Sequence, residues 1–323
     1  SIATDTGIEP EIWKEIAGLG WLGIIVPEEF GGLGLALSDV VPIVESMGRH
    51  LMSAPYCSTV MATQAIASSG DSEQKSRWLP KIVEGDVGTV ALTEVDGSWN
   101  LDEVECQGLE EGEGIRLQGV KCFVQDLAMA KWVVVSAKIE GATRLMVLDM
   151  TEVPETHYSR EVVIDETRRS FRLDLDGLTV PKENLLIGTD FQSLGSAALL
   201  MLCAEISGGL MGVLPVIVEY LNTRKAFDRT IGSYQALKHP TVDILMSLEG
   251  ARSHLYHAST LLSQGKLEEF ESAVRMAKAQ GSEAFAFAGD RAVQFHGGFG
   301  FTYECDAQLF LRRALWCQYQ FGD

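Results

Sequence analysis

One polar stretch has residue types that suit the binding of a flat, anionic group. It begins at Arg224, continues through Phe227 and a glycine at position 232, and leads into a second helix start near Gln235. A guanidinium matches the geometry of phosphate oxygens, and an aromatic ring offers a flat apolar face. Because this stretch follows a long apolar segment, we expect a buried helix to deliver it to a binding site.

The segment that positions Arg224 runs from about Leu194 to Thr223 and is apolar almost all the way round. Such a helix is buried on most of its faces, and we expect Pro215 to kink it. Its length also suits a membrane span. However, Glu205 interrupts the run, as do several glycines and Pro215, so the central helix of a large bundle is the preferred interpretation.

Composition narrows the classes of partner and compartment. The net charge of −19 argues against nucleic acid and anionic membrane surfaces. The six cysteines are scattered without a CxxC pair, so neither a zinc site nor a redox motif is expected, and we predict no metal. The sequence contains no recognisable secretory signal. A cytoplasmic location is therefore the expectation.

The order of the predicted elements is helices, then strands, then helices. We predict an N-terminal helical domain over residues 1–87, a central antiparallel β-barrel domain over 88–188 and a C-terminal four-helix bundle over 189–323. Segregation of this kind is typical of separate domains and not of a βαβ fold. Because no GxGxxG motif follows a strand, a bound nucleotide would not be held in the Rossmann manner.

Five motifs in this order resemble the acyl-CoA dehydrogenase family over nearly the whole chain. They are Trp21 to Gly34, Ala91 to Glu94 with Gly97-Ser98, Gly119 to Val124, Arg224 to His239, and Gln294 to Phe301. The resemblance implies three domains of the kinds predicted above, with FAD at their junction. It also implies an acyl-CoA substrate, an electron-transfer flavoprotein as electron acceptor, and dimers or tetramers formed through the bundle.

The resemblance also assigns roles to single residues. Arg224 would bind the FAD pyrophosphate of a neighbouring subunit, Phe227 would pack on the adenosine, and Ser98 would lie near the pantetheine or phosphate of the acyl-CoA. The remaining cofactor-binding residues that it implies are Leu92 and Thr93, Phe123 and Gln125 beside the flavin ring, Gln235, and Gln294 with Gly297 and Gly298 along the dinucleotide.

The chain departs from the family pattern at the substrate loop and at two cofactor positions. The loop after Glu94 is one residue shorter than usual and contains Trp99. Gln125 replaces a threonine that faces the flavin. Asp228 replaces the glycine after Phe227, which places a carboxylate near the proposed phosphate site.

The catalytic base is also displaced. The family's late glutamate aligns with Phe321, so Asp323 is the nearest acid, and the family's alternative position aligns near Ala198. Glu205, alone in an apolar helix, is a second candidate, because burial raises a carboxyl pKa toward the range that a general base needs. The same glutamate could instead brace a neighbouring helix.

These observations leave three hypotheses. The chain could dehydrogenate an acyl-CoA by itself in fatty acid or steroid catabolism. It could be the shorter subunit of an α2β2 heterotetramer with a homologous subunit that owns the base, acting on a steroid side-chain CoA ester. It could also be a non-catalytic helical-bundle partner that only lends FAD contacts or has lost flavin. The departures at Trp99 and at the base favour the second.

Overall fold

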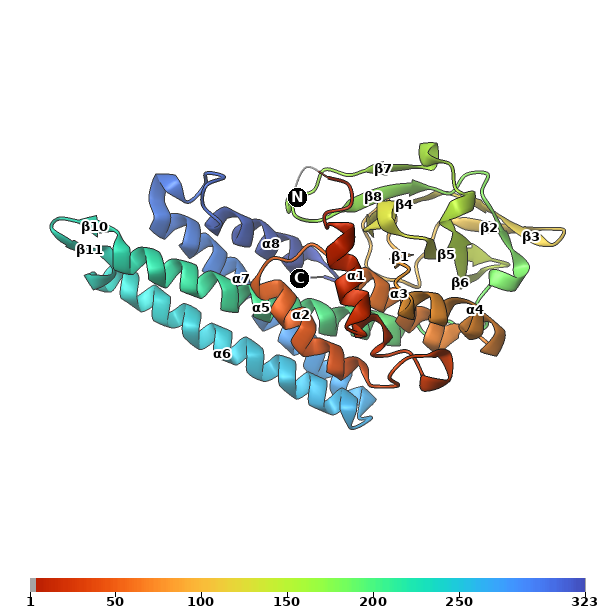
Figure 1. The fold of residues 1–323 in the computed structure, drawn as a ribbon, viewed down its shortest axis with the longest axis horizontal. Helices are drawn as coiled ribbons and strands as arrows, with labels where there is room; N and C mark the ends of the chain where they lie inside the picture. Colours follow the sequence, from red (N-terminus) through yellow and green to blue (C-terminus); the bar gives the residue numbers. More distant parts are fainter. Residues whose placement is uncertain (1–3, 323) are drawn as a thin grey trace. The chain divides into compact units, whose positions relative to one another are not determined.

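The computed structural model describes residues 4–322, and the chain forms two compact units. The first, called the β unit here, comprises residues up to 37 together with 53–163 and 168–197. The second, called the bundle unit, comprises residues 38–52, 164–167 and 198 onward. Helices, strands and helices follow one another as the sequence predicts (Figure 1). The compact units nevertheless differ from the predicted domains. Residues 38–52, from the predicted N-terminal domain, and residues 164–167, from the predicted β domain, belong to the bundle unit.

The helices of the β unit are α1 (Pro10–Gly18), α3 (Tyr56–Ser69) and α4 (Ser72–Val83). The start of α4 shows how local sequence sets a boundary. The Asp71 side chain accepts from the backbone N–H of Gln74, while the Gln74 side chain accepts from the Asp71 N–H. This capping box satisfies two backbone donors that the first helical turn leaves free. The N-cap of α4 is therefore Asp71.

The strands of the β unit form a six-stranded sheet and a three-stranded sheet. The six-stranded sheet contains β1 (Gly88–Ala91), β2 (Gln107–Glu111), β3 (Gly114–Gln118), β5 (Trp132–Ile139), β6 (Ala142–Asp149) and β9 (Thr179–Pro181). The three-stranded sheet contains β4 (Val120–Gln125), β8 (Ser170–Asp174) and β7 (Tyr158–Arg160), in that order.

The prediction of a purely antiparallel β domain needs correction. β1 pairs with β5 in parallel, with Gly88 opposite Trp132, and β2 meets β5 in parallel as well. Parallel neighbours require a long connection, and residues 92–131 supply it by forming β2, β3 and β4 before the chain returns. As a result β5 lies inside the sheet, and nearly all of its residues are buried.

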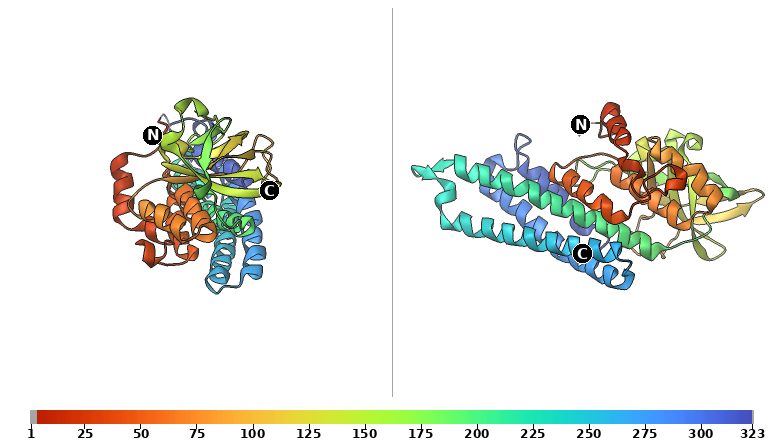
Figure 2. Two further views of the ribbon diagram at one scale, coloured as in Figure 1. Left: turned by 90° about the vertical axis from the view of Figure 1, so that its right-hand side faces the viewer. Right: turned by 60° about the horizontal axis from the view of Figure 1, so that its bottom comes forward.

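The bundle unit consists of α2 (Val41–Arg49), α5 (Phe191–Thr223), α6 (Gln235–Ser263), α7 (Leu267–His296) and α8 (Ala307–Tyr319). Figure 2 shows α5 and α6 running side by side, with the short hairpin of β10 (Lys225–Ala226) and β11 (Arg229–Thr230) at their shared end. The helix α2 approaches α5 closely at glycines. A Cβ on Gly208 would lie 1.9 Å from the carbonyl oxygen of Glu45, and one on Gly48 would lie 2.3 Å from that of Glu205.

The helix α5 is the core helix of the bundle. It is long and apolar enough to cross a membrane by length and composition, but 67% of its most apolar 18-residue window is buried inside the protein. The apolar surface is therefore covered by protein, as the bundle interpretation predicts. Continuous through Pro215, α5 delivers Arg224 at its end.

Candidate functional site

A two-residue turn after α5 presents the predicted cofactor residues. Following Arg224, β10 (Lys225–Ala226) and β11 (Arg229–Thr230) pair through a turn made by Phe227 and Asp228. Both turn residues have positive φ, 52° and 62°, which a two-residue type I′ hairpin requires. A phenylalanine in this conformation is an outlier of the kind found at binding sites. Its ring is 91% exposed.

Contacts within the bundle unit hold this hairpin on the end of α5 and α6. The backbone N–H of Ile231 donates to the Arg224 carbonyl (2.9 Å), and the Tyr234 hydroxyl donates to the Ala226 carbonyl (3.2 Å). The Arg229 guanidinium lies 4.0 Å above the ring of Tyr234. Gln235, a predicted cofactor residue, is the first residue of α6. The hairpin is therefore a fixed platform and not a loose loop.

The glycine pair after α7 lies at the same end of the bundle. The ring of Tyr220, one turn before Arg224, stacks on His296 with ring centroids 4.1 Å apart, and Arg224 donates its backbone N–H to the Tyr220 carbonyl. His296 immediately precedes Gly297. The two distant stretches therefore meet through Tyr220 and His296. Binding of one dinucleotide by Arg224, Gly297 and Gly298 together stays a prediction.

The surface at Gly297 and Gly298 is open. A Cβ built on either glycine meets nothing within 4 Å. Gly297 needs a glycine for its backbone, with φ 60° and ψ −139°, whereas the packing of this chain does not require one at Gly298. Gln294, three residues before Gly297 in the sequence, is exposed, and so is Arg224 after α5.

This donor set fits the pyrophosphate and adenosine of FAD. It offers a guanidinium, an amide, an exposed aromatic ring and backbone without side chains. It is also locally cationic, since four Lys or Arg side chains and one carboxylate lie between residues 220 and 241 of a chain with a net charge of −19. Phosphate binding is favoured by such a field. The single carboxylate, Asp228, works against it.

The predicted flavin-ring residues lie together in the β unit. Leu92 and Thr93 follow β1, and the Thr93 carbonyl accepts the backbone N–H of Cys122 on β4 (2.9 Å). The register of β4 against β8 shifts between Lys121 and Val124. Within this bulge Phe123 has a φ of 57° and is 36% exposed.

A carboxylate holds the bulge in place. The Glu161 side chain accepts the Phe123 backbone N–H (2.9 Å) and the Ser170 hydroxyl (2.8 Å). Gln125, where a flavin-facing threonine is usual, donates its amide to the Phe123 carbonyl (3.2 Å). The ring of Phe123 is therefore turned outward by contacts from β4 and from the chain just after β7. Sequence reasoning missed Glu161, because nothing in its neighbourhood signals a partner thirty-eight residues away.

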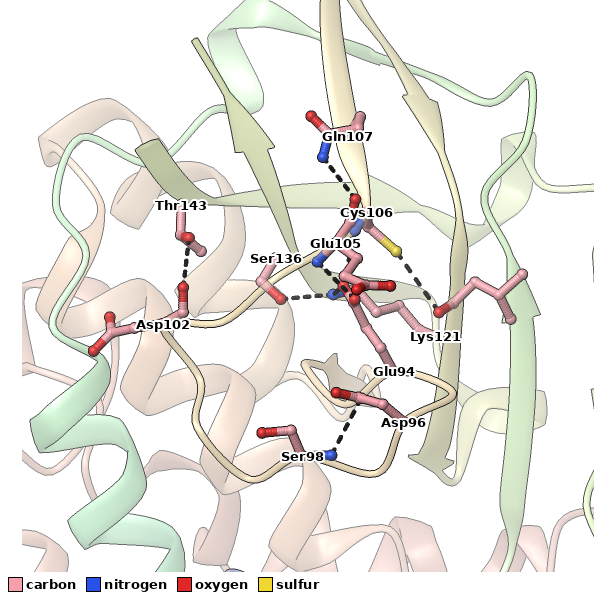
Figure 3. A network of polar contacts seen from close by, with 11 residues as sticks. Glu94, Asp96, Ser98, Asp102, Glu105, Cys106, Gln107, Lys121, Ser136 and Thr143 are labelled. Carbon is pink, nitrogen blue, oxygen red and sulfur yellow. Dashed lines mark hydrogen bonds and ion pairs between the residues drawn. The ribbon is translucent and has the colours of Figure 1, made fainter. Parts of the chain in front are cut away.

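A buried ion pair supports the loop that contains Thr93. Figure 3 shows the Glu94 carboxylate bound to the Lys121 ammonium at 2.7 Å and to the backbone N–H groups of Glu105 and Cys106, while Lys121 also donates to the Ser136 hydroxyl. Burial alone raises the pKa of Glu94, but these hydrogen bonds outweigh it, so the pKa lies below its ordinary value. The pair ties Glu94, the residue after Thr93, to Lys121 on β4.

The shortened loop after Glu94 is a chain of local turns. The Ser98 N–H donates to the Asp96 carboxylate and the Ser98 hydroxyl accepts the Asn100 N–H, each at 3.2 Å. Ser98 and Trp99 are half-buried. A contact of Ser98 with acyl-CoA stays a prediction.

The structure argues against Glu205 as the general base. Its carboxylate binds the guanidinium of Arg313, which also binds Asp165 and Thr167. The side chains of Arg313, Asp165 and Glu205 are no more than 10% exposed. A base must reach the proton that it removes, and this carboxylate is enclosed in an ion pair. The arrangement fits the bracing role that the sequence left open.

The other candidate base cannot be placed. Asp323 lies outside the residues that the structure describes. Position 321, where the family's late glutamate aligns, holds a phenylalanine with a φ of 58°. Among residues 4–322, none of the carboxylates predicted as a base is therefore in a position to remove a proton.

Similarity to known proteins agrees with this geometry. The family model described as "Acyl-CoA dehydrogenase, N-terminal domain" matches residues 2–86, and "Acyl-CoA dehydrogenase, C-terminal domain" matches residues 197–322. Acyl-CoA dehydrogenase FadE12 of Mycobacterium tuberculosis is 29% identical over 310 residues, covering 91% of this chain and 79% of its own length.

Two solved assemblies resemble the chain over almost its full length. A variant of the Tcur3481–Tcur3483 steroid ACAD matches with a TM-score of 0.88 and 27% identity, covering 99% of this chain and 87% of the other. The ChsE4–ChsE5 complex of Mycobacterium tuberculosis matches with a TM-score of 0.88 and 25% identity, covering 99% and 86%. With its fold, its nucleotide-facing motifs and both terminal domain models in agreement, this chain belongs to the acyl-CoA dehydrogenase family, whose cofactor is FAD.

Proposed function

We propose that this chain is one subunit of a heteromeric acyl-CoA dehydrogenase that introduces an α,β double bond into an acyl-CoA thioester. The substrate class that we favour is a steroid side-chain CoA ester. When bound, FAD would supply the acceptor for the hydride that leaves the β-carbon, and a carboxylate would remove the α-proton. The residues of this chain bind and orient the cofactor, and the partner subunit supplies the carboxylate.

The observation that carries this proposal is an asymmetry within the chain. The residues that the family uses for the nucleotide are present, and Tyr220 contacts both the Arg224 backbone and the His296 ring, which precedes Gly297. The acidic residue, in contrast, is replaced by Phe321, and Glu205 is enclosed by Arg313. A subunit that lends phosphate contacts to a flavin whose base lies elsewhere would have this combination. Two structural relatives are complexes of two different chains by name, and one is named a steroid ACAD.

The test is co-expression with a homologous subunit encoded beside this chain. We expect a stable yellow complex that reduces a dye, or electron-transfer flavoprotein, with a steroid side-chain CoA ester. The chain purified alone should bind FAD weakly and lack activity. A fully flavinylated, active homotetramer of this chain would contradict the heteromeric part of the proposal. A change of Arg224→Gln should lower the FAD content of the complex, whereas Arg224→Lys should lower it less because a charge remains.

A second candidate function is a bundle partner that has lost flavin, and Asp228 is the observation that favours it. Its carboxylate lies in the turn that presents Phe227. Titration of the complex with FAD distinguishes the two functions. Micromolar or tighter binding supports the dehydrogenase subunit, and no change in the visible absorption of FAD at any ratio supports the alternative.

A further inference from the structure

Tyr220 forms the link between the two nucleotide-facing segments. It lies on α5 one turn before Arg224, and its ring stacks on the His296 ring at a centroid distance of 4.1 Å and an interplanar angle of 28°. Phe299 lies beside the stack, with its ring centroid 6.4 Å from both Tyr220 and His296. Aromatic pairs at these separations contribute beyond the area that they bury.

The same residue caps the end of α7. The last carbonyl groups of a helix lack donors within the helix, and the Tyr220 hydroxyl donates to the carbonyl of His296, the final residue of α7, at 3.4 Å. The His296 ring is fixed from its own side, because its Nδ1 lies 2.7 Å from the Ala292 carbonyl. That carbonyl can only accept, so Nδ1 carries the hydrogen. His296 is only 5% exposed.

The position of this stack gives it a consequence for binding. Directly after His296 the backbone takes the conformation at Gly297 that requires a glycine, and Gly297 and Gly298 then face open space. Three residues after Tyr220 the α5 helix ends at Thr223, immediately before Arg224. The stack therefore connects His296, the last residue of α7 before the glycine pair, to the last turn of α5 before Arg224. Segments held in their bound conformation lose less conformational entropy when a ligand binds.

We infer that Tyr220 is a positioning residue that holds the Gly297–Gly298 segment in register with Arg224 for a shared dinucleotide ligand. The inference rests on the function proposed above for the identity of that ligand. The link itself is made only by residues of this chain, so its effect on the backbone can be measured with or without FAD. Tyr220 itself acts through His296 and the α5 end and need not touch the cofactor.

The experiment compares three variants in the co-expressed complex. Tyr220→Phe keeps the stack and loses the hydrogen bond, and Tyr220→Leu loses both. Tyr319→Leu is the matched control, because Tyr319 is a bundle tyrosine that is 61% exposed on α8. Hydrogen exchange of the backbone amides of residues 297–300 is measured without FAD, and the affinity for FAD is measured by quenching of flavin fluorescence.

We expect faster exchange at residues 297–300 and about tenfold weaker FAD binding in Tyr220→Leu. Tyr220→Phe should recover most of the affinity, and Tyr319→Leu should match the unmodified complex in both measurements. Exchange at 297–300 that is unchanged in Tyr220→Leu would overturn the link itself. Faster exchange with unchanged FAD affinity would overturn its role in positioning. If the unmodified complex binds no FAD, the proposed function fails, and the exchange data still decide whether the link exists.

Discussion

The β unit and the bundle unit both bury charge, but they do so in different ways. In the β unit Lys121 and Glu94 form a pair whose side chains are 0% and 9% exposed, and their remaining hydrogen-bonding capacity is used by Ser136 and two backbone N–H groups. In the bundle unit the single guanidinium of Arg313 binds two carboxylates and a threonine hydroxyl.

The difference lies in what each cluster joins. The Lys121 pair fixes one loop to its own sheet, and all of its partners lie between residues 94 and 136. The Arg313 cluster joins α8 to α5 and to the linker of residues 164–167, three segments that are far apart in the sequence. A buried pair is weak evidence of net stability, but removing one partner leaves a charge without compensation. Removing Arg313, which binds two carboxylates, should therefore lower the free energy of unfolding more than removing Lys121, which binds one.

The largest effect is expected for Arg313→Met. This change leaves Asp165 and Glu205 buried beside each other without their shared cation, and the free energy of unfolding should fall by about 4–5 kcal/mol. Arg312→Met is the matched control, because its neighbour Arg312 pairs with Glu166 at 2.9 Å and is 32% exposed. The control should lose no more than about 1 kcal/mol. Denaturant unfolding of both variants measures the difference, and equal losses would contradict the distinction drawn here.

Lys121→Met should have the next largest effect, with a loss of about 3–4 kcal/mol. The Glu94 carboxylate would keep its backbone donors, Glu105 and Cys106, and so would lose only part of its compensation. The double variant Lys121→Met with Glu94→Gln removes both charges and should recover at least half of the loss. A double variant no more stable than Lys121→Met would show that packing, and not the uncompensated charge, dominates at this position.

A third cluster, around Glu45 in the bundle unit, is less buried than the other two and gives a pH-dependent prediction. Glu45 on α2 accepts from Ser207, Arg252 and Tyr256, and the Arg252 side chain is 37% exposed. Burial raises the pKa of Glu45, but the hydrogen bonds from Arg252, Ser207 and Tyr256 lower it more, so that it lies below its ordinary value. A carboxylate of this kind adds stability above its unfolded pKa of about 4.3 and loses it as the pH falls through the folded pKa.

Glu45→Gln should therefore cost about 1–2 kcal/mol at pH 7. Its cost should shrink as the pH falls below about 4.3, because the unmodified carboxyl then becomes protonated as well. Urea unfolding at several pH values from neutral to acid measures both chains. A cost that stays constant over this range would assign the effect of Glu45 to shape and not to charge.

The sequence predicts the parts of this molecule that depend on local pattern. The order of elements and the buried helix before Arg224 follow from periodicity and turn residues. The expectation that Arg224 and the glycine segment bind one dinucleotide comes instead from the resemblance to the family, and it stays a prediction. The parallel pairing of β1 with β5 could not be predicted, because β-branched runs separated by turn residues do not specify strand neighbours.

The prediction of Glu205 as a candidate base shows that local sequence is equally limited in assigning the roles of site residues. Glu205 is an acid in an apolar helix, and its neighbours on that helix do not reveal a cation. Arg313 lies on α8 and Asp165 on the linker, so that only the folded bundle brings the three together. Phe123, which has a positive φ, likewise donates its backbone N–H to a distant side chain, that of Glu161 just after β7. The roles of these residues therefore depend on contacts with residues far away in the sequence, and the sequence alone identifies them only as candidates.

The two units also differ in how they hold a phenylalanine at positive φ, and the smallest prediction concerns this difference. In the β unit Glu161 holds Phe123 by a hydrogen bond, whereas in the bundle unit the hairpin itself holds Phe227 and places Asp228 at a φ of 62°. Aspartate tolerates this conformation, so Asp228→Gly should change the free energy of unfolding by no more than about 0.5 kcal/mol. Its effect should instead appear in FAD binding, because the change removes a carboxylate from a cationic site.

Asp228→Asn separates the charge from the backbone in this test. Asparagine keeps the size of the side chain and tolerates positive φ equally well. If repulsion of the phosphates is the cause, both Asp228→Asn and Asp228→Gly should tighten FAD binding about twofold to fivefold at low salt, and the gain should shrink in 1 M salt, where the Debye length is about 3 Å. If only Asp228→Gly tightens binding, and salt does not matter, the turn's backbone limits the approach of the cofactor. Equal affinity in all three chains would mean that the carboxylate points away from the ligand, and the hairpin would then bind FAD as well with an aspartate as with the glycine that the family usually has there.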